Sequence, residues 1–284
     1  MRVLIIGARG MLGTDLLQEW EGDELIPASS RDADIRVAAQ VHSLLAHARP
    51  DWTVLAAAYT DVDGSEHNPE NAFAVNACGT ENVARAAKEV GSRLFFVSTD
   101  YLFDGTSTRP YEPDDPIAPL NLYGQSKAAG EKAIREHHRD WSIARRSWLF
   151  GAARACFPEK ILRASETRSD LTVVADQVGS PTFTRDLARM IRDLVRMEAR
   201  GTLNVTNEGC CSWFEFAEET LRQAGRSSFR VSPITTAEAR RPARRPSCSV
   251  LAPASLNALG LRMRPWCDAL SAHLKELQET GDLG

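Results

Sequence analysis

The sequence contains no apolar run long enough to span a lipid bilayer, which takes about 20 predominantly apolar residues. Its six cysteines, at positions 78, 156, 210, 211, 248 and 267, include no CxxC pair, which argues against a zinc knuckle or a dithiol site. Thiols scattered in this way are expected to be reduced. Neither sign of charge dominates, because 38 acidic and 34 basic residues give a net charge of −4. The chain therefore lacks the electrostatic footprint of a nucleic-acid-binding protein.

The 284 residues, 43% of them hydrophobic, are enough to build one large domain or two closely packed domains. The N-terminal apolar stretch 1–6 reaches Gly7 too early for a signal peptide, so a cytoplasmic protein is expected. No internal repeat or low-complexity tract is present. The chain is thus expected to be a globular protein with no membrane or nucleic-acid partner.

Apolar runs of strand length alternate with segments of helical period in the first half of the chain. The strand-like runs cover 2–6, 24–28, 52–57, 93–98 and 142–150, and the helical segments cover 11–20, 37–48, 69–90 and 120–138. Runs that are apolar on both faces are typical of parallel strands covered by helices. This alternation predicts an α/β fold with a Rossmann-like, doubly wound parallel sheet.

The alternation becomes looser after residue 150. Short strands are expected at 171–175 and 202–205, and helices at 185–198, 212–224 and 266–279. We therefore predict an NAD(P)-binding Rossmann domain over 1–150, completed by later segments. The remainder, 151–284, is predicted to be mainly a smaller substrate-binding lobe that shares strands with the first.

A glycine-rich turn directly follows the first predicted strand and directly precedes the first predicted helix. Its glycines, Gly7, Gly10 and Gly13, follow the spacing GxxGxxG, and Arg9, Met11 and Leu12 lie between them. Small residues here let the backbone approach a pyrophosphate, whose charge the helix N-terminus attracts. A tight turn that merely packs helix against strand is the simpler interpretation. The strand–turn–helix context favours a dinucleotide site.

The second predicted strand ends in Ser29-Ser30-Arg31, where an acidic residue would hold an adenosine ribose diol. A missing acid together with Arg31 favours a 2′-phosphate, and hence NADPH over NADH, although NADH is not excluded. A solvated turn explains the same residues. Slightly further on, Asp34 and Ile35 are expected to flank the adenine, with Asp34 accepting from its amino group.

Small residues end the third predicted strand, where Ala56, Ala57 and Ala58 are followed by Tyr59 and Thr60. They would let the middle of the cofactor approach the backbone. Tight sheet–helix packing accounts for the alanines equally well, but it does not require the last two residues.

Two segments about two dozen residues apart carry the chemistry. Tyr123 and Lys127 lie four residues apart in a predicted helix, so they share one face, and the ammonium can favour ionisation of the phenol. Thr99 ends a hydrophobic strand, where its hydroxyl could hold the substrate oxygen that the tyrosine protonates. The three residues together predict a proton-donating active site, with Val97 on the same strand contacting the cofactor.

A series of motifs in fixed order resembles the dTDP-4-dehydrorhamnose reductase family, within the extended short-chain dehydrogenases/reductases. The motifs are GARGMLG (7–13), AAAYTDVD (56–63), FAVNACGT (73–80), STDYLFDG (98–105), PLNLYGQSKAAGE (119–131), RRSWLFG (145–151), DQVGSPTFTRDLA (176–188) and PARRPSCSVL (242–251). The likeness therefore covers nearly the whole chain. STDYLFDG followed by YGQSK distinguishes this family from generic nucleotide-sugar epimerases.

The resemblance implies reduction of the C4 keto group of dTDP-4-dehydro-L-rhamnose to dTDP-L-rhamnose, the last step of dTDP-rhamnose biosynthesis. Tyr123 would be the general acid, and Lys127 would supply positive charge and hold the nicotinamide ribose. Thr99 would hydrogen-bond the reacting oxygen. Asp100 would bind a sugar hydroxyl, and Tyr101 and Trp148 would flank the sugar or the nicotinamide.

Several of these roles have a plainer alternative. Asp100 could cap the turn after its strand, and Trp148 could be core. The segment 176–182 reads as a turn and a helix N-cap that shapes the pocket. Arg241, Arg244 and Arg245 would either bind the diphosphate or form a solvated loop.

The chain departs from the family pattern at Leu55, where the family commonly carries Asn. Some bacterial members hold magnesium at a dimer interface through glutamates, so a homodimer is a possible assembly. No motif places those ligands in this chain. We therefore predict no required metal.

Three functions remain open from the sequence. The first is the reductase, acting on this or a related dTDP-linked 4-keto-6-deoxy sugar. The second is a non-catalytic, NADP-binding regulatory subunit of the methionine adenosyltransferase type, and the third is an epimerase or dehydratase that retains NAD. Intact Thr99, Tyr123 and Lys127 favour the first.

Overall fold

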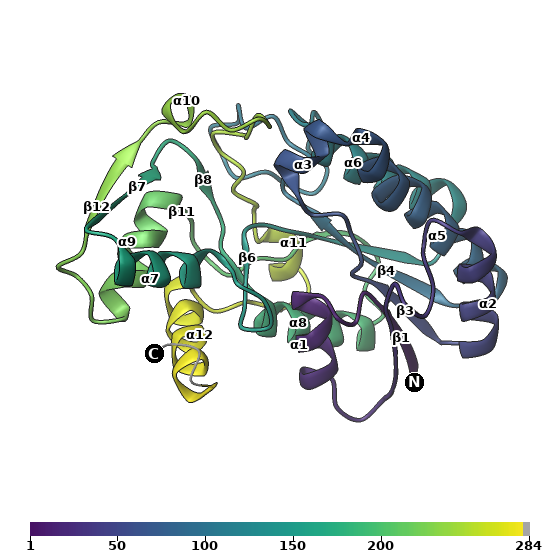
Figure 1. The fold of residues 1–284 in the computed structure, drawn as a ribbon. Helices are drawn as coiled ribbons and strands as arrows, with labels where there is room; N and C mark the ends of the chain where they lie inside the picture. The colour runs from purple at the N-terminus through teal and green to yellow at the C-terminus, as the bar shows by residue number, and fades with distance from the viewer. Residues whose placement is uncertain (281–284) are drawn as a thin grey trace.

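A computed structural model describes residues 1–280 and contains a six-stranded sheet in which all strands are parallel (Figure 1). In spatial order its strands are β10 (Gly201–Asn204), β5 (Trp141–Arg146), β4 (Arg93–Thr99), β3 (Trp52–Leu55), β1 (Arg2–Ile6) and β2 (Glu24–Ala28). The predicted doubly wound α/β architecture is confirmed.

The strand order reverses between β1 and β3, because the chain leaves β1 toward β2 and then returns to the other side of β1. Loops after the carboxyl ends of such neighbouring strands diverge and leave a crevice, which is where open α/β sheets bind ligands. Gly7 follows β1 at this point and Ala56 follows β3. The sequence thus places its glycine turn at the topological switch point.

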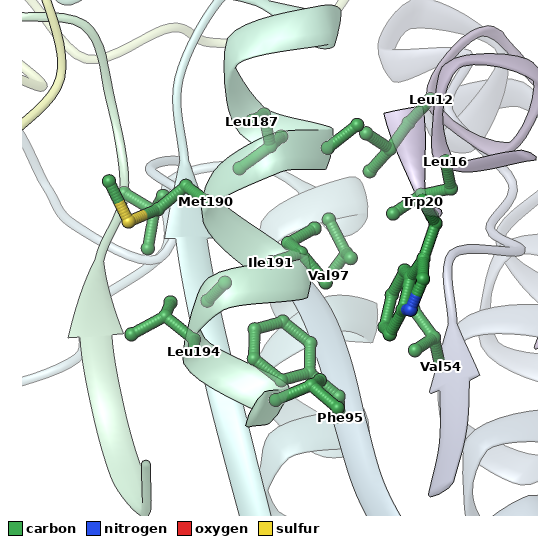
Figure 2. Packing of buried hydrophobic residues seen from close by; sticks show 14 of the residues in the cluster. Leu12, Leu16, Trp20, Val54, Phe95, Val97, Leu187, Met190, Ile191 and Leu194 are labelled. Carbon is green, nitrogen blue, oxygen red and sulfur yellow. The ribbon is translucent and has the colours of Figure 1, made fainter. Parts of the chain in front are cut away.

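Helices cover both faces of the sheet (Figure 1). One face carries α1 (Met11–Glu19) and α8 (Thr184–Arg196), and the other carries α2 (Ala38–Ala48), α5 (Thr80–Glu89) and α6 (Leu122–His137). Figure 2 shows Leu187 and Ile191 of α8, Leu16 of α1 and the sheet residue Phe95 within one buried cluster. All four are fully buried, and each such side chain stabilises the fold by roughly 1.5–3 kcal/mol.

The segments after residue 150 contribute both to the large sheet and to a second core. Strand β10 pairs with β5, and α8 packs against α1. The second core gathers α7 (Phe157–Thr167), α9 (Trp213–Gln223) and α12 (Trp266–Thr280) beside the parallel pair β7 (Asp170–Val174) and β12 (Arg230–Ile234). The boundary at residue 150 stays a prediction, and residues 281–284 of the predicted second lobe lie outside the described residues.

Shorter elements connect these parts. They are α3 (Val62–His67), α4 (Pro69–Phe73), β6 (Leu149–Phe150), β8 (Val178–Gly179), β9 (Thr182–Phe183), β11 (Cys211–Ser212), α10 (Thr236–Ala239) and α11 (Ala254–Asn257). None of the helices within residues 1–280 combines the length and the apolar character needed to cross a membrane.

Two predicted elements are interrupted. The helix expected over 69–90 contains the π-helical turn η1 (Ala74–Gly79) between α4 and α5. The strand expected over 142–150 is divided into β5 and β6, because Trp148 between them has a left-handed backbone with φ of 44°. Both interruptions lie beside the crevice, where such irregularities commonly serve function.

Candidate active site

A cleft of about 1090 Å³ begins at the glycine turn and extends past the carboxyl ends of β3, β4 and β5 into the second half of the chain. Most site residues predicted from the sequence line it, but Tyr59, Lys127 and the three candidate arginines of the late loop do not. Those that line it are Gly7, Arg9, Gly10, Met11, Leu12, Gly13, Arg31, Asp34, Ile35, Ala57, Ala58, Thr60, Val97, Thr99, Asp100, Tyr101, Tyr123 and Trp148. One continuous cleft therefore joins the predicted cofactor and substrate residues.

At Gly7 and Gly13 the glycine turn leaves no room for a side chain. Gly7 has φ of 99°, and a Cβ added there would lie 2.6 Å from the backbone nitrogen of Ala57. A Cβ on Gly13 would lie 2.1 Å from the carbonyl oxygen of Gly7. The N-cap of α1, Gly10, has no side chain to bond the first N–H groups of the helix. A bare helix N-terminus facing a cleft suits an anionic group such as a pyrophosphate.

In the loop after β2, two carboxylates are held by hydrogen-bond donors of the same loop. Asp32 accepts from the N–H and the hydroxyl of Ser29, both at 2.8 Å, and these hydrogen bonds lower the pKa of Asp32. Asp34 accepts from Arg36 at 2.6 Å, and this pairing lowers the pKa of Asp34. Arg31 makes no ion pair with any described residue. The role of Asp34 toward an adenine stays a prediction.

A buried asparagine in η1 holds the loop after β3. The Asn76 side chain accepts from the Tyr59 N–H at 2.9 Å and donates to the Tyr59 carbonyl at 3.0 Å and to the Ser126 hydroxyl at 2.9 Å. The Tyr59 hydroxyl lies by Gly64 of α3, away from the cleft lining. A cofactor contact by the Tyr59 side chain therefore stays a prediction, and the observed role of this residue is in its backbone.

The start of α6, which carries the predicted acid, is fixed from three directions. The N-cap Asn121 accepts from the Gly124 N–H and donates to the Arg244 carbonyl, both at 2.8 Å. Glu66 accepts from the Leu122 N–H at 2.9 Å. A Cβ on Gly124 would lie 2.1 Å from the Tyr101 carbonyl oxygen, so only glycine permits this approach of helix and loop. These contacts hold the first turn of α6 against the cleft.

Tyr123 and Lys127 lie on one face of α6, but their polar atoms have different surroundings. The Tyr123 ring meets Tyr101 edge-on, with centroids 5.9 Å apart. The Lys127 ammonium is buried 4.0 Å from the centre of the Phe96 ring and donates to the Val97 carbonyl at 2.8 Å. Burial, followed by the positive charge of Arg146, lowers the pKa of Lys127 to about 7. The ammonium is therefore buried behind the residues that line the cleft, and one of its N–H donors is already bonded to the Val97 carbonyl.

Thr99 and Asp100 follow one another at the end of β4. The Thr99 hydroxyl donates to Asp100 at 3.1 Å, and Asp100 also accepts from Ser147 at 2.9 Å and from Ser249 at 2.6 Å. Burial raises the pKa of Asp100, while these hydroxyls and the charge of Arg146 oppose the rise. The Asp100 carboxylate thus ties three segments together, and its contact with a sugar hydroxyl stays a prediction.

Trp148 forms an aromatic wall together with a residue from α9. Its indole stacks on Trp213 with ring centroids 3.6 Å apart and an interplanar angle of 9°. A Cβ on Gly179 of β8 would lie 2.5 Å from the Trp148 ring, so the segment 176–182 shapes this wall. Both indoles line the cleft. Flat aromatic surfaces of this kind suit the faces of sugars or bases.

The three candidate arginines of the late loop are not part of the cleft lining. Arg245 donates to both carboxylate oxygens of Asp63 at 2.9 Å, and Arg241 lies 3.8 Å from the same carboxylate. The backbone carbonyl of Arg244 accepts a hydrogen bond from the side-chain amide of Asn121. These contacts connect the loop to α3 and to the start of α6. Diphosphate binding by the three guanidinium groups stays a prediction.

One cluster within the described residues combines side chains that can ligate metals, namely Cys156, Glu159 and His273, all buried. The Cys156 sulfur lies 3.5 Å from Nε2 of His273 and 3.9 Å from a carboxylate oxygen of Glu159. A buried thiol with two polar partners is satisfied without an ion. The prediction that no metal is required stays a prediction.

Sequence reasoning missed several residues of the site. Arg146 lines the cleft, and its terminal nitrogen lies 3.5 Å from the Tyr123 hydroxyl. Sequence reasoning also missed Trp213 and Asn76. Their partners, Trp148 and Tyr59, lie 65 and 17 residues away along the chain. The available signal for Arg146 is its position at the end of a buried strand, two residues before Trp148 in RRSWLFG.

Comparison with known proteins identifies the family. The family model described as RmlD substrate binding domain matches residues 1–279. The chain belongs to this family. It is 38% identical to a dTDP-4-dehydrorhamnose reductase of Mycobacterium tuberculosis over 96% of this chain and 92% of that protein. It is 36% identical to the spore coat polysaccharide biosynthesis protein SpsK of Bacillus subtilis over 99% of each.

A solved structure extends the likeness to three dimensions. The dTDP-4-dehydrorhamnose reductase of Bacillus anthracis, determined in complex with NADP, superimposes with a TM-score of 0.93 at 38% identity, covering 97% of this chain and 99% of that chain. For this member of the RmlD family, the resemblance seen in the motifs is therefore confirmed over nearly the whole length.

Proposed function

We propose that the protein is an NADPH-dependent reductase that converts the C4 keto group of dTDP-4-dehydro-L-rhamnose to the alcohol of dTDP-L-rhamnose. One observation carries the proposal. The Tyr123 phenol and the Thr99 hydroxyl line the same cleft as the glycine turn, so a dinucleotide and a sugar can meet there. Family membership, with relatives named for this reaction, supports the same activity.

The residues of the first half of the cleft suit a nicotinamide dinucleotide. Gly7 and Gly13 leave a bare backbone surface that a Cβ would fill, at the N-terminus of α1. Ala57 and Ala58 continue this surface toward Thr99. When bound, the reduced nicotinamide supplies the hydride. The chain supplies binding, orientation and the proton.

Tyr123 donates its phenolic proton to the C4 oxygen as that oxygen gains negative charge. A phenol in water has a pKa near 10, so this transfer needs nearby positive charge. Lys127 is the first source of that charge, and two of its three donors remain after the Val97 carbonyl. The Thr99 hydroxyl turns from Asp100 to the C4 oxygen and stabilises the same charge.

The aromatic wall forms the substrate side of the proposed site. Trp148 and Trp213 form a stacked indole pair in the half of the cleft that the second part of the chain lines. We assign the sugar of a dTDP-linked 4-keto-6-deoxy substrate to this half, with Tyr101 beside Tyr123. The cytoplasmic location and a homodimeric assembly stay predictions.

We expect Arg31→Ala to lower kcat/KM for NADPH by roughly 10-fold and to leave that for NADH within about twofold. The reason is that Arg31 would meet the 2′-phosphate, since Asp32 and Asp34 are held by Ser29 and Arg36. Steady-state kinetics with both cofactors measures the change. Arg49→Ala, outside the cleft lining, is the matched control. An equal loss with NADH would show that Arg31 does not read the phosphate.

The function itself is tested by following NADPH oxidation at 340 nm with a panel of dTDP-linked 4-keto-6-deoxy sugars. We expect turnover with dTDP-4-dehydro-L-rhamnose and a product that co-elutes with dTDP-L-rhamnose. Turnover confined to another sugar of the panel would identify a related reductase. NADPH binding without turnover on any sugar would contradict the proposal and favour the regulatory-subunit alternative.

A further inference from the structure

Two arginines at the end of β5, adjacent in sequence, point to opposite faces of the sheet. Arg145 is 1% exposed, and its guanidinium donates to both carboxylate oxygens of Glu131 at 3.0 and 2.8 Å. Arg146 is aligned with Thr99 in the register of the neighbouring strand and lines the cleft. Because side chains alternate along a strand, the pairing of Arg145 away from the cleft places Arg146 toward it.

The guanidinium of Arg146 has few direct partners, although its charge acts on the buried carboxylate of Asp100. It forms no ion pair with any carboxylate of the described residues. Its Nε–H is buried and has no hydrogen-bond partner within residues 1–280. Its terminal nitrogen donates to the Tyr123 hydroxyl at 3.5 Å, a long contact. A buried donor without an acceptor is costly, and a permanent charge beside a cleft favours negative charge on a neighbour or a ligand.

We propose that Arg146 is a further catalytic residue, a guanidinium that stabilises the negative charge left on the Tyr123 oxygen when its proton moves to the substrate. This inference rests on the proposed reductase function. As C4 receives hydride from NADPH, the O–H bond of Tyr123 breaks and a new O–H bond forms on the C4 oxygen. The electron pair of the broken bond stays on the phenolic oxygen. The hydrogen bond from Arg146 to that oxygen then becomes charge-assisted, shorter and stronger.

Lys127 does not make this role redundant. Its ammonium donates to the Val97 carbonyl beneath the cleft, and it is absent from the cleft lining. An arginine keeps its charge at all accessible pH, whereas an ammonium in a buried site loses its charge more easily. The two cations thus act at different depths, with Arg146 directly at the oxygen of Tyr123.

The test compares the wild type with Arg146→Ala and Arg146→Lys in NADPH-dependent reduction of dTDP-4-dehydro-L-rhamnose. We expect Arg146→Ala to lower kcat by about 10- to 100-fold with the Kd for NADPH within about threefold, and Arg146→Lys to retain part of the rate. Guanidinium ion added at millimolar concentration should restore part of the rate of Arg146→Ala and should not raise the rate of any other enzyme in the comparison. Arg222→Ala, which removes an exposed guanidinium paired with Glu219 of α9, should behave as the wild type.

The outcomes separate this proposal from the function on which it rests. An inactive wild type would overturn both. An active wild type with Arg146→Ala equally active would overturn only the role of Arg146. A loss that appears in the Kd for NADPH, without rescue by guanidinium, would also overturn it, because it would assign Arg146 to cofactor binding. If Arg146→Ala does not fold, Arg146→Gln is judged by the same criteria.

Discussion

Replacing Tyr123 with phenylalanine is expected to lower kcat by about 10²- to 10⁴-fold, the range spanned by a general acid or base. The substitution removes one oxygen and leaves the ring, which is 3% exposed and packs edge-on against Tyr101. Binding of NADPH and the melting temperature should therefore change little. Steady-state and single-turnover kinetics of NADPH oxidation measure the loss, and fluorescence quenching measures cofactor binding.

Tyr111→Phe is the matched control for this experiment. Tyr111 is 5% exposed, and its hydroxyl donates to Asp104 at 2.8 Å, so the same oxygen is removed from an equally buried ring. Tyr111 stacks on Phe103 and does not line the cleft. We expect this variant to keep the wild-type kcat and to lose some stability. A Tyr123→Phe enzyme with kcat within threefold of the wild type would exclude Tyr123 as the proton donor.

The fold could be predicted from the sequence because its strands are covered on both faces. Strands such as β1 and β3 are then continuous apolar runs, which stand out against the helical period between them. Their ends shift by a few residues, since β3 stops at Leu55 where both Ala56 and Ala57 turn to donate to the Ile6 carbonyl. The break at Trp148 could not be predicted, because a left-handed backbone at a tryptophan is set by its packing on Trp213 and Gly179.

The residues of the candidate site likewise differ in whether the sequence could predict them. Residues that act through local spacing, such as the glycines of the first turn and the pair Tyr123 and Lys127, were predictable from a turn and a helical period. Arg146 was not, since its place depends on the register of β5 against β4. The sequence also could not show that Asp100 is surrounded by the hydroxyls of Ser147 and Ser249, the second of which is 149 residues away.

The helix that carries the proposed acid is anchored by a buried ion pair. Tyr123, Lys127 and Glu131 form one stripe along α6, at intervals of four residues. Glu131 is fully buried and accepts two hydrogen bonds from Arg145 of β5 and one from Arg135 at 2.9 Å. Burial alone would raise the pKa of Glu131, but the hydrogen bonds and charge of Arg145 outweigh it, so the pKa lies below its usual range.

We expect Glu131→Gln to lower the free energy of unfolding by about 3–5 kcal/mol, because it leaves Arg145 buried with an uncompensated charge. Urea denaturation measures the difference. Since the pKa of Glu131 is lower in the folded state, its contribution is fully present above the unfolded pKa and is lost as the pH falls through the folded pKa. The gap between variant and wild type should therefore be widest near neutral pH and narrow in acid.

Two further variants decide whether the ion pair itself is responsible. Glu136→Gln, on an exposed turn of α6 with Lys132 3.7 Å away, should change stability by less than about 0.5 kcal/mol. Glu131→Leu combined with Arg145→Met should recover much of the loss, because it removes both charges and keeps apolar volume. A double variant no more stable than Glu131→Gln would instead mean that Arg145 is needed for its hydrogen bond to the Pro113 carbonyl. In that case the anchor of α6 would extend beyond the ion pair into the loop before the helix.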